Sequence, residues 1–179
     1  MSTVAEREAD LSLRTAQGFV RPRVWWPPDA ADGSPVAVFL ADDEAGLRAA
    51  HALCLEAGCV VLALQTAAPD VATIALEWAG DHAGALGADP DRLLVAGGRL
   101  AATAALDARD NGWPMLSRQV LIGPDRPGWP PADVDLAGAA PATVVNAPAY
   151  AARLAEAGVE VDEVRLAEPI GFDWMHDLA

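Results

Sequence analysis

The stretch that decides the fold runs GADPDRLLVAGG over residues 87–98. Gly87 closes a predicted helix, because glycine adopts the left-handed geometry just past a helix end without a steric penalty. The residues DPD at 89–91 then make a turn, and a continuous apolar run follows at 93–96. Such a run is typical of a strand that is buried on both faces, as in a parallel sheet. The stretch therefore predicts a helix end, a turn and a buried strand that stops at two glycines.

The same alternation of apolar runs and helical patterns extends through the chain. Further strands are expected at 36–40, 59–64, 119–122, 143–146 and 161–166. Helical segments lie between them, and four of these end at a glycine: Gly58, Gly87, Gly112 and Gly158. Two segments at 11–17 and 20–26, joined at Gly18, predict an antiparallel hairpin within residues 10–34. We expect one α/β domain over 1–179, with a mostly parallel central sheet that starts with this hairpin and has helices on both faces.

Composition and charge narrow the range of partners. The chain has 179 residues, of which 53% are hydrophobic, and a net charge of −14 without any lysine. Such a surface repels nucleic acid and anionic lipid, and a Schiff base on lysine is excluded. No apolar run reaches the roughly 18–20 residues that span a bilayer, and the first residues lack a signal peptide's apolar block, so a cytoplasmic protein is expected. Cys54 and Cys59 are expected to be small buried side chains, and no metal or other cofactor is expected.

One segment, 124–141, interrupts the pattern with five prolines and no periodicity. We expect it to form an ordered loop over the carboxyl ends of the strands, where open α/β sheets bind ligands. Trp129 lies in this proline-rich loop. A tryptophan beside prolines suggests a pocket lid or a partner surface, and packing against the core is the alternative.

Several motifs resemble the α/β-hydrolases, and more narrowly the hormone-sensitive-lipase-like esterases. They are GCVVLAL at 58–64, ALEW at 75–78, LGADPDRLLVAG at 86–97, QVLIGP at 119–124 and AYAARLAEAG at 149–158. The resemblance covers about 11–172 and implies a sheet whose central strand ends at a nucleophile elbow. It also implies that the proline-rich loop replaces the family's cap domain, so the fold is expected to be trimmed.

The chain departs from the family at the elbow and at the oxyanion loop. The family's Gly-Asp-Ser-Ala-Gly appears as GGRLA at 97–101, so Arg99 takes the place of the nucleophilic serine. The family's His-Gly-Gly-Gly appears as ADDE at 41–44. Carboxylates at that place have the wrong sign for stabilising an oxyanion.

Two further departures concern the acid and the histidine. No Asp or Glu follows the strand at 143–146, and the family's His-Gly-Phe appears as IGF at 170–172. Ile170 therefore takes the place of the histidine, and His176 is the one histidine expected near the site. Loss of the serine alone typically lowers turnover by about 10⁶. We therefore expect no serine esterase activity by the family's mechanism.

A candidate pocket follows from these positions. Its expected lining is Asp42, Asp43, Gly97, Gly98, Arg99, Leu100 and Trp129. Arg99 either forms an ion pair with Asp42 or Asp43, or binds an anion at a helix N-terminus. The two aspartates either act in acid–base chemistry with His176, or cap the following helix.

Three functions remain open at this stage. The first is a catalytically degenerate hydrolase that binds a small molecule or a protein partner, including a second copy of the chain. That homodimer would form along the last expected strand, which begins at Val161 and ends at Leu166. The second is a non-hydrolytic enzyme, such as a cyclase, isomerase or lyase, with Asp42, Asp43, Arg99 and His176 around a pocket beneath the loop at 124–141. The third is a residual hydrolase with an unrecognised nucleophile.

Overall fold

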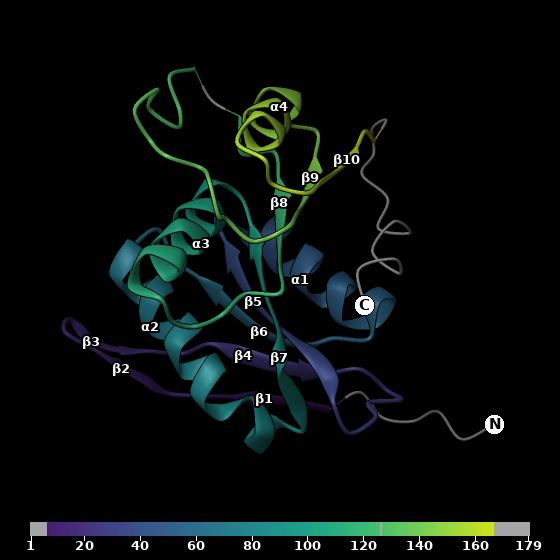
Figure 1. Cartoon of the computed structure of the whole chain (residues 1–179). Helices are drawn as coiled ribbons and strands as arrows, with labels where there is room; N and C mark the ends of the chain where they lie inside the picture. Colours follow the sequence, from purple (N-terminus) through teal and green to yellow (C-terminus); the bar gives the residue numbers. More distant parts are fainter. Residues whose placement is uncertain (1–6, 126, 167–179) are drawn as a thin grey trace.

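The computed structural model describes residues 7–125 and 127–166. In this part of the chain an eight-stranded sheet has the order β1-β4-β6-β5-β7-β8-β9-β10 (Figure 1). The strands are β1 (Arg7–Asp10), β4 (Arg23–Trp26), β5 (Ser34–Ala41), β6 (Val60–Gln65), β7 (Ala88–Gly97), β8 (Arg118–Ile122), β9 (Ala142–Val145) and β10 (Val161–Val164). Strands β5 to β10 are parallel, whereas β1 and β4 are antiparallel to their neighbours. The predicted mostly parallel sheet with an antiparallel start is confirmed.

The expected hairpin is present but divided. Its tip forms a separate two-stranded sheet of β2 (Leu13–Thr15) and β3 (Gly18–Val20), with the turn at residues 16–17 and Gly18 as the first residue of β3. The outer parts of the two arms join the main sheet as β1 and β4. The second arm is interrupted after β3 by Pro22, which has no N–H to donate to a neighbouring strand.

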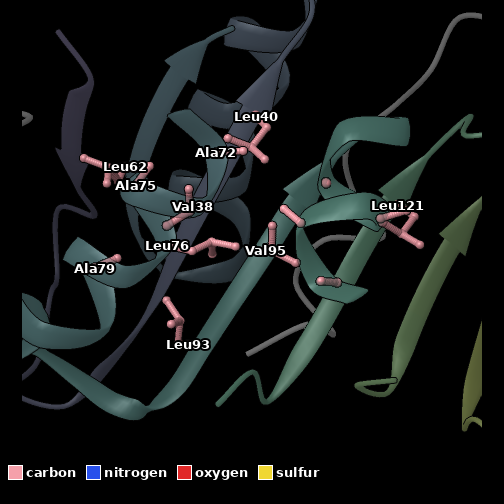
Figure 2. Close-up of a cluster of buried hydrophobic side chains, with 14 of the residues drawn as sticks. Val38, Leu40, Leu62, Ala72, Ala75, Leu76, Ala79, Leu93, Val95 and Leu121 are labelled. Carbon is pink, nitrogen blue, oxygen red and sulfur yellow. The ribbon is translucent and has the colours of Figure 1, made fainter. Parts of the chain in front are cut away.

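Helices cover both faces of the sheet, as expected. They are α1 (Glu44–Ala57), α2 (Pro69–His82), a short 3-10 helix η1 (Ala83–Leu86), α3 (Arg99–Asn111) and α4 (Pro148–Glu156). Helix α1 packs on one face, and α2, α3 and α4 pack on the other. Because side chains alternate along a strand, β5 sends Phe39 toward α1 and Val38 and Leu40 toward α2 and α3. Figure 2 shows the second of these clusters, in which Val38, Leu62 and Val95 meet side chains of α2. Burial on both faces explains the continuous apolar runs.

The predicted helix ends and buried thiols are confirmed. Gly58, Gly87 and Gly112 follow α1, η1 and α3 in the left-handed region. Gly158 stands one residue beyond the C-cap of α4, also with a positive φ. Cys54 and Cys59 are buried, and burial raises the pKa of the Cys59 thiol to about 12.

The described residues of the proline-rich loop, 124–125 and 127–141, take a path that differs from the prediction. Arg109 of α3 donates to the carbonyl oxygens of Asp135 at 2.9 Å and Ala137 at 2.8 Å. Arg153 of α4 donates to the carbonyl oxygens of Pro130 and Pro131. These two arginines hold the loop against α3 and α4. Among the described residues of the loop, Pro124 is the one that lines the cavity at the strand ends.

Candidate functional site: the bend at Arg99

The order of the strands locates the site before any side chain is considered. From β5 the chain passes through α1 to β6 on one side, and from β7 it passes through α3 to β8 on the other. The two connections diverge at the carboxyl ends of β5 and β7. Ligands of open α/β sheets bind in the crevice at such a switch point.

The bend after β7 requires a glycine at its first position. Gly97 has a φ of 138°, and a Cβ there would lie 2.3 Å from the carbonyl oxygen of Leu40 on β5. Gly98 is the N-cap of α3, and Arg99 is the first residue of that helix. The chain therefore turns from strand to helix within one residue and leaves the Arg99 side chain exposed at the switch point.

A cavity of about 240 Å³, which we call the Arg99 cavity, lies at this bend. It is lined by Asp42, Ala67, Pro69, Gly98, Arg99, Leu100, Thr103, Ile122, Gly123 and Pro124. Four residues of the predicted pocket are thus brought together: Asp42, Gly98, Arg99 and Leu100. Gly97 lies directly below them as the buried end of β7, and Asp43 and Trp129 are not part of the lining.

Of the two alternatives for Arg99, the ion pair with Asp42 or Asp43 is not formed within the described residues. The Asp43 carboxylate instead accepts a hydrogen bond from the Gly46 N–H at 2.9 Å as the N-cap of α1. The Asp42 carboxylate lies against the backbone of Gly98. All three charged groups are exposed, so water solvates them and an ion pair between them would gain little.

The N-termini around the site differ in how they are capped. Asp43 caps α1, and the Asp125 carboxylate caps α4 by accepting from the N–H groups of Ala149 at 3.2 Å and Tyr150 at 3.0 Å. Helices α2 and α3 have no side-chain cap, and their first residues, Pro69 and Arg99, line the Arg99 cavity. Two helix N-termini without a side-chain cap and the Arg99 guanidinium thus bring positive charge to this cavity, and the Asp42 carboxylate brings negative charge to it.

Trp129 does not line the Arg99 cavity, but it lines two other hollows, one beside α4 and one beside α3. Its ring lies 5.1 Å from that of Tyr150, and the side chain is partly buried against the core. The anchoring of the proline-rich loop on α3 and α4 draws Trp129 away from the strand ends. Packing against the core, the alternative reading, is the one the structure supports.

Two residues with clear roles were not singled out by sequence reasoning. Asn146 directly follows β9, where the resemblance implies an acid, and has a φ of 53°. Its side-chain oxygen accepts from the Leu166 N–H at 2.9 Å. Asparagine tolerates the left-handed region, which is a signal that the sequence contains. The sequence contains no such signal for Asp125, because the N–H groups that it accepts from are distant in the sequence. Ile170 and His176 lie outside the described residues.

The other chemical groups give little indication of a second centre. Within the described residues, no cluster of His, Cys, Asp and Glu could hold a metal ion. The ring of His82 stacks on Trp78 at 4.6 Å, and the ring of His51 lies 5.2 Å from that of Trp25. Among the helices that the structure describes, none is long and apolar enough to cross a membrane.

Comparison with known proteins adds relatives at the sequence level. No family model matches the chain. It is 34% identical to the carboxylesterase NlhH of Mycobacterium tuberculosis over 122 residues, which cover 57% of this chain and 38% of that protein. It is 30% identical to the esterase LipI of the same species over 168 residues, which cover 82% of this chain and 52% of that protein. The chain therefore spans about half the length, or less, of these curated relatives.

Solved structures show the same fold. EstE1, a thermophilic carboxylesterase cloned from a metagenomic library, matches with a TM-score of 0.78 at 22% identity. The match covers 96% of this chain and 82% of that chain. At this identity the likeness establishes the fold, and the sequence relatives supply the family. The strand order, the strand-to-helix bend and these relatives together show that the chain belongs to the α/β-hydrolase family, in the group of the hormone-sensitive-lipase-like esterases.

Proposed function

We propose that this chain is a catalytically degenerate α/β-hydrolase that binds a small anionic molecule in the Arg99 cavity and does not hydrolyse esters. The observation that carries the proposal is the identity of Arg99 at the bend after β7. In the related esterases this bend presents a serine hydroxyl. A guanidinium remains protonated and has no lone pair with which to attack an acyl carbon.

The loop after β5 supports the same proposal. Only Asp42 and Asp43 separate β5 from α1, and Asp43 is occupied as a helix cap. Asp42 places a carboxylate beside Gly98. An oxyanion that forms next to a carboxylate is destabilised, whereas an esterase needs donors aimed at that place.

The hydroxyl groups of Ser34, Thr103 and Ser117 are engaged in hydrogen bonds to backbone carbonyl oxygens. Ser34 and Ser117 lie at the amino ends of β5 and β8, away from the Arg99 cavity. They donate to the carbonyl oxygens of Ala31 and Leu93. Thr103 lines the Arg99 cavity, but its hydroxyl donates to the carbonyl oxygen of Arg99 at 3.1 Å. A residual hydrolase is therefore less well supported than a binding protein.

The surroundings of the cavity favour a small anion as the ligand. Arg99 and the uncapped N-termini of α2 and α3 attract negative charge. Asp42 opposes a second negative charge on the ligand, so a monoanion fits better than a polyanion. A volume of about 240 Å³ lies below the usual range for drug-sized ligands, about 300–1,000 Å³, which favours a molecule of few atoms.

The test has a catalytic arm and a binding arm. We expect no labelling by a fluorophosphonate and no hydrolysis of p-nitrophenyl butyrate above the buffer rate. In an NMR titration with acetate, the amides of residues 98–103 should shift and saturate. Arg99→Gln should weaken that binding about tenfold, since it removes a charged hydrogen bond. Arg14→Gln, on the exposed hairpin, is the control and should bind like the parent protein.

Two results would contradict the proposal. Stoichiometric labelling by the fluorophosphonate would show a working nucleophile. Acetate shifts that are the same in Arg99→Gln as in the parent would remove Arg99 from the site.

One observation favours a second candidate, a non-hydrolytic acid–base enzyme. Asp42 lines the same cavity as Arg99, so a carboxylate could exchange a proton with a bound molecule. Asp43, its expected partner, is engaged as the α1 cap. Deuterium exchange into a carbon acid held in the cavity, lost in Asp42→Asn, would favour this candidate over simple binding.

A further inference from the structure

A second hollow lies between α1 and the antiparallel corner of the sheet, where β1, β4 and β6 run side by side (Figure 1). We call it the α1 groove. Its volume is about 860 Å³, within the range of about 300–1,000 Å³ usual for small-molecule sites. It shares no lining residue with the Arg99 cavity, so the two sites can be tested separately.

Part of the groove is apolar. Trp25 of β4 is 8% exposed and packs in the core beneath α1, so its ring forms a fixed wall. Leu47 of α1 packs against the same cluster as Trp25 and adds aliphatic surface to the groove. A rigid apolar wall of this kind favours a ligand with a hydrocarbon body, because burial of apolar surface stabilises the complex.

Some charged groups of the groove have partners, and two arginines do not. Asp10 forms an ion pair with Arg23 at 3.2 Å, and the Glu8 carboxylate accepts from the indole N–H of Trp25 at 3.2 Å. Arg21 and Arg48 also line the groove. Neither guanidinium group has an ion pair, a hydrogen bond or a ring contact within residues 7–125 and 127–166.

This concentration of positive charge is unusual for the molecule. In the described part of the chain, the arginines whose guanidinium groups lack all three kinds of contact are Arg14, Arg21, Arg48 and Arg99. Two of the four lie in this groove, although the chain carries a net charge of −14. An anionic head group would give Arg21 and Arg48 the partners that they lack.

We propose that the α1 groove binds one amphipathic monocarboxylate, with its hydrocarbon body on Trp25 and Leu47 and its carboxylate at Arg48 and Arg21. A single negative charge fits better than a phosphate dianion, because Glu8 and Asp10 lie in the same lining and repel a second charge. This site goes beyond the proposed function, which concerns the Arg99 cavity.

The experiment is calorimetric titration with decanoate below its critical micelle concentration. We expect saturable binding of one molecule per chain. Decanol, which has the same hydrocarbon body without the charge, should bind at least about tenfold more weakly. Arg48→Gln and Arg21→Gln should each weaken decanoate binding about tenfold. Arg14→Gln should leave it unchanged, and circular dichroism checks that each variant is folded.

Arg99→Gln separates this proposal from the proposed function, because it should leave decanoate binding intact while acetate binding is weakened. The inference is overturned if decanol binds as tightly as decanoate, or if no saturable binding occurs. It is also overturned if Arg21→Gln and Arg48→Gln both bind like the parent, or if Arg99→Gln abolishes decanoate binding.

Discussion

Gly97 is the residue on which the strand-to-helix bend depends most. A methyl group at this position would lie 2.3 Å from the Leu40 carbonyl oxygen, and the φ of 138° is itself unfavourable for alanine. We predict that Gly97→Ala lowers the free energy of unfolding by about 3 kcal/mol or more, from overlap and strain together. Urea denaturation followed by circular dichroism measures the change.

Gly18 provides a matched control for this prediction. Its φ of 128° is close to that of Gly97, but no atom lies within 4 Å of the position of its Cβ. Gly18→Ala should therefore show the backbone strain without the overlap. Equal losses in the two variants would mean that the approach of β7 to Leu40 contributes nothing.

Tyr150 gives a prediction for pH dependence. Burial raises the pKa of this phenol from 10.0 to about 12. The folded chain thus holds the proton more tightly than the unfolded chain, and the resulting stability is fully present below pH 10 and is lost as the pH rises toward 12. Because Tyr150 is the chain's only tyrosine, absorbance of the phenolate near 295 nm reports it directly.

A variant tests the same residue. The Tyr150 hydroxyl is buried and has no hydrogen-bond partner among the described residues. Tyr150→Phe keeps the ring beside Trp129 and removes that unsatisfied group, so the free energy of unfolding should not decrease. A loss of more than about 1 kcal/mol would indicate that the hydroxyl has a partner after all.

Single residues could be predicted from the sequence where the cause is local. The bend at Arg99 follows from a buried strand that ends at two glycines before a helical pattern, and the structure places Arg99 there. The ion pair with Asp42 or Asp43 could not be judged, because it depends on side-chain directions across two neighbouring loops. The direction of Trp129 depends on Arg109 and Arg153, which lie far from it in the sequence.

At the scale of elements, the N-terminus of α1 gives the two adjacent aspartates different roles. Asp43 accepts from Gly46, whereas Asp42 makes no side-chain bond to the first turn of the helix. Asp43→Ala should lower the free energy of unfolding by about 1 kcal/mol. Asp42→Ala should change it by less than about 0.5 kcal/mol. Equal effects in thermal or urea denaturation would show that the two carboxylates exchange roles.

Helix α4 is capped from outside its own sequence. Asp125, which follows β8, binds the N–H groups of Ala149 and Tyr150. We predict that Asp125→Ala lowers the free energy of unfolding by about 1 kcal/mol and speeds hydrogen exchange in the first turn of α4. Asp133→Ala, an exposed change in the same loop, is the control. Unaltered exchange in Asp125→Ala would count against this cap.

Elements were predictable where burial repeats along the chain. Each expected parallel strand is found, and from β5 to β9 the apolar runs reflect burial on both faces of the sheet, whereas β10 is only partly buried. The boundaries of the hairpin strands could not be predicted. Pro22 ends one strand, and the pairing of β1 with β4 is set by contacts across the sheet. The path of the proline-rich loop has no periodic signal at all.

At the scale of the whole molecule, β10 is the outer strand at one side of the sheet. The exposed Asp162 carboxylate lies 2.7 Å from the Arg118 guanidinium. The backbone of Val161 and Glu163 faces outward, since Glu160 and Val164 accept from the β9 side. We propose that a second copy of the chain pairs along this edge, as the sequence analysis anticipates.

The charge of the molecule determines when such a dimer would form. Each copy carries a net charge of −14, so repulsion opposes association at low ionic strength and salt screens it. We predict that light scattering after size exclusion shows a monomer in dilute buffer and a growing dimer fraction as salt and protein concentration increase. Glu163→Pro removes an outward N–H without interrupting the ladder to β9, so it should abolish the dimer and leave the fold intact. A strict monomer at high salt and high concentration, or a dimer that persists in Glu163→Pro, would rule out pairing through β10.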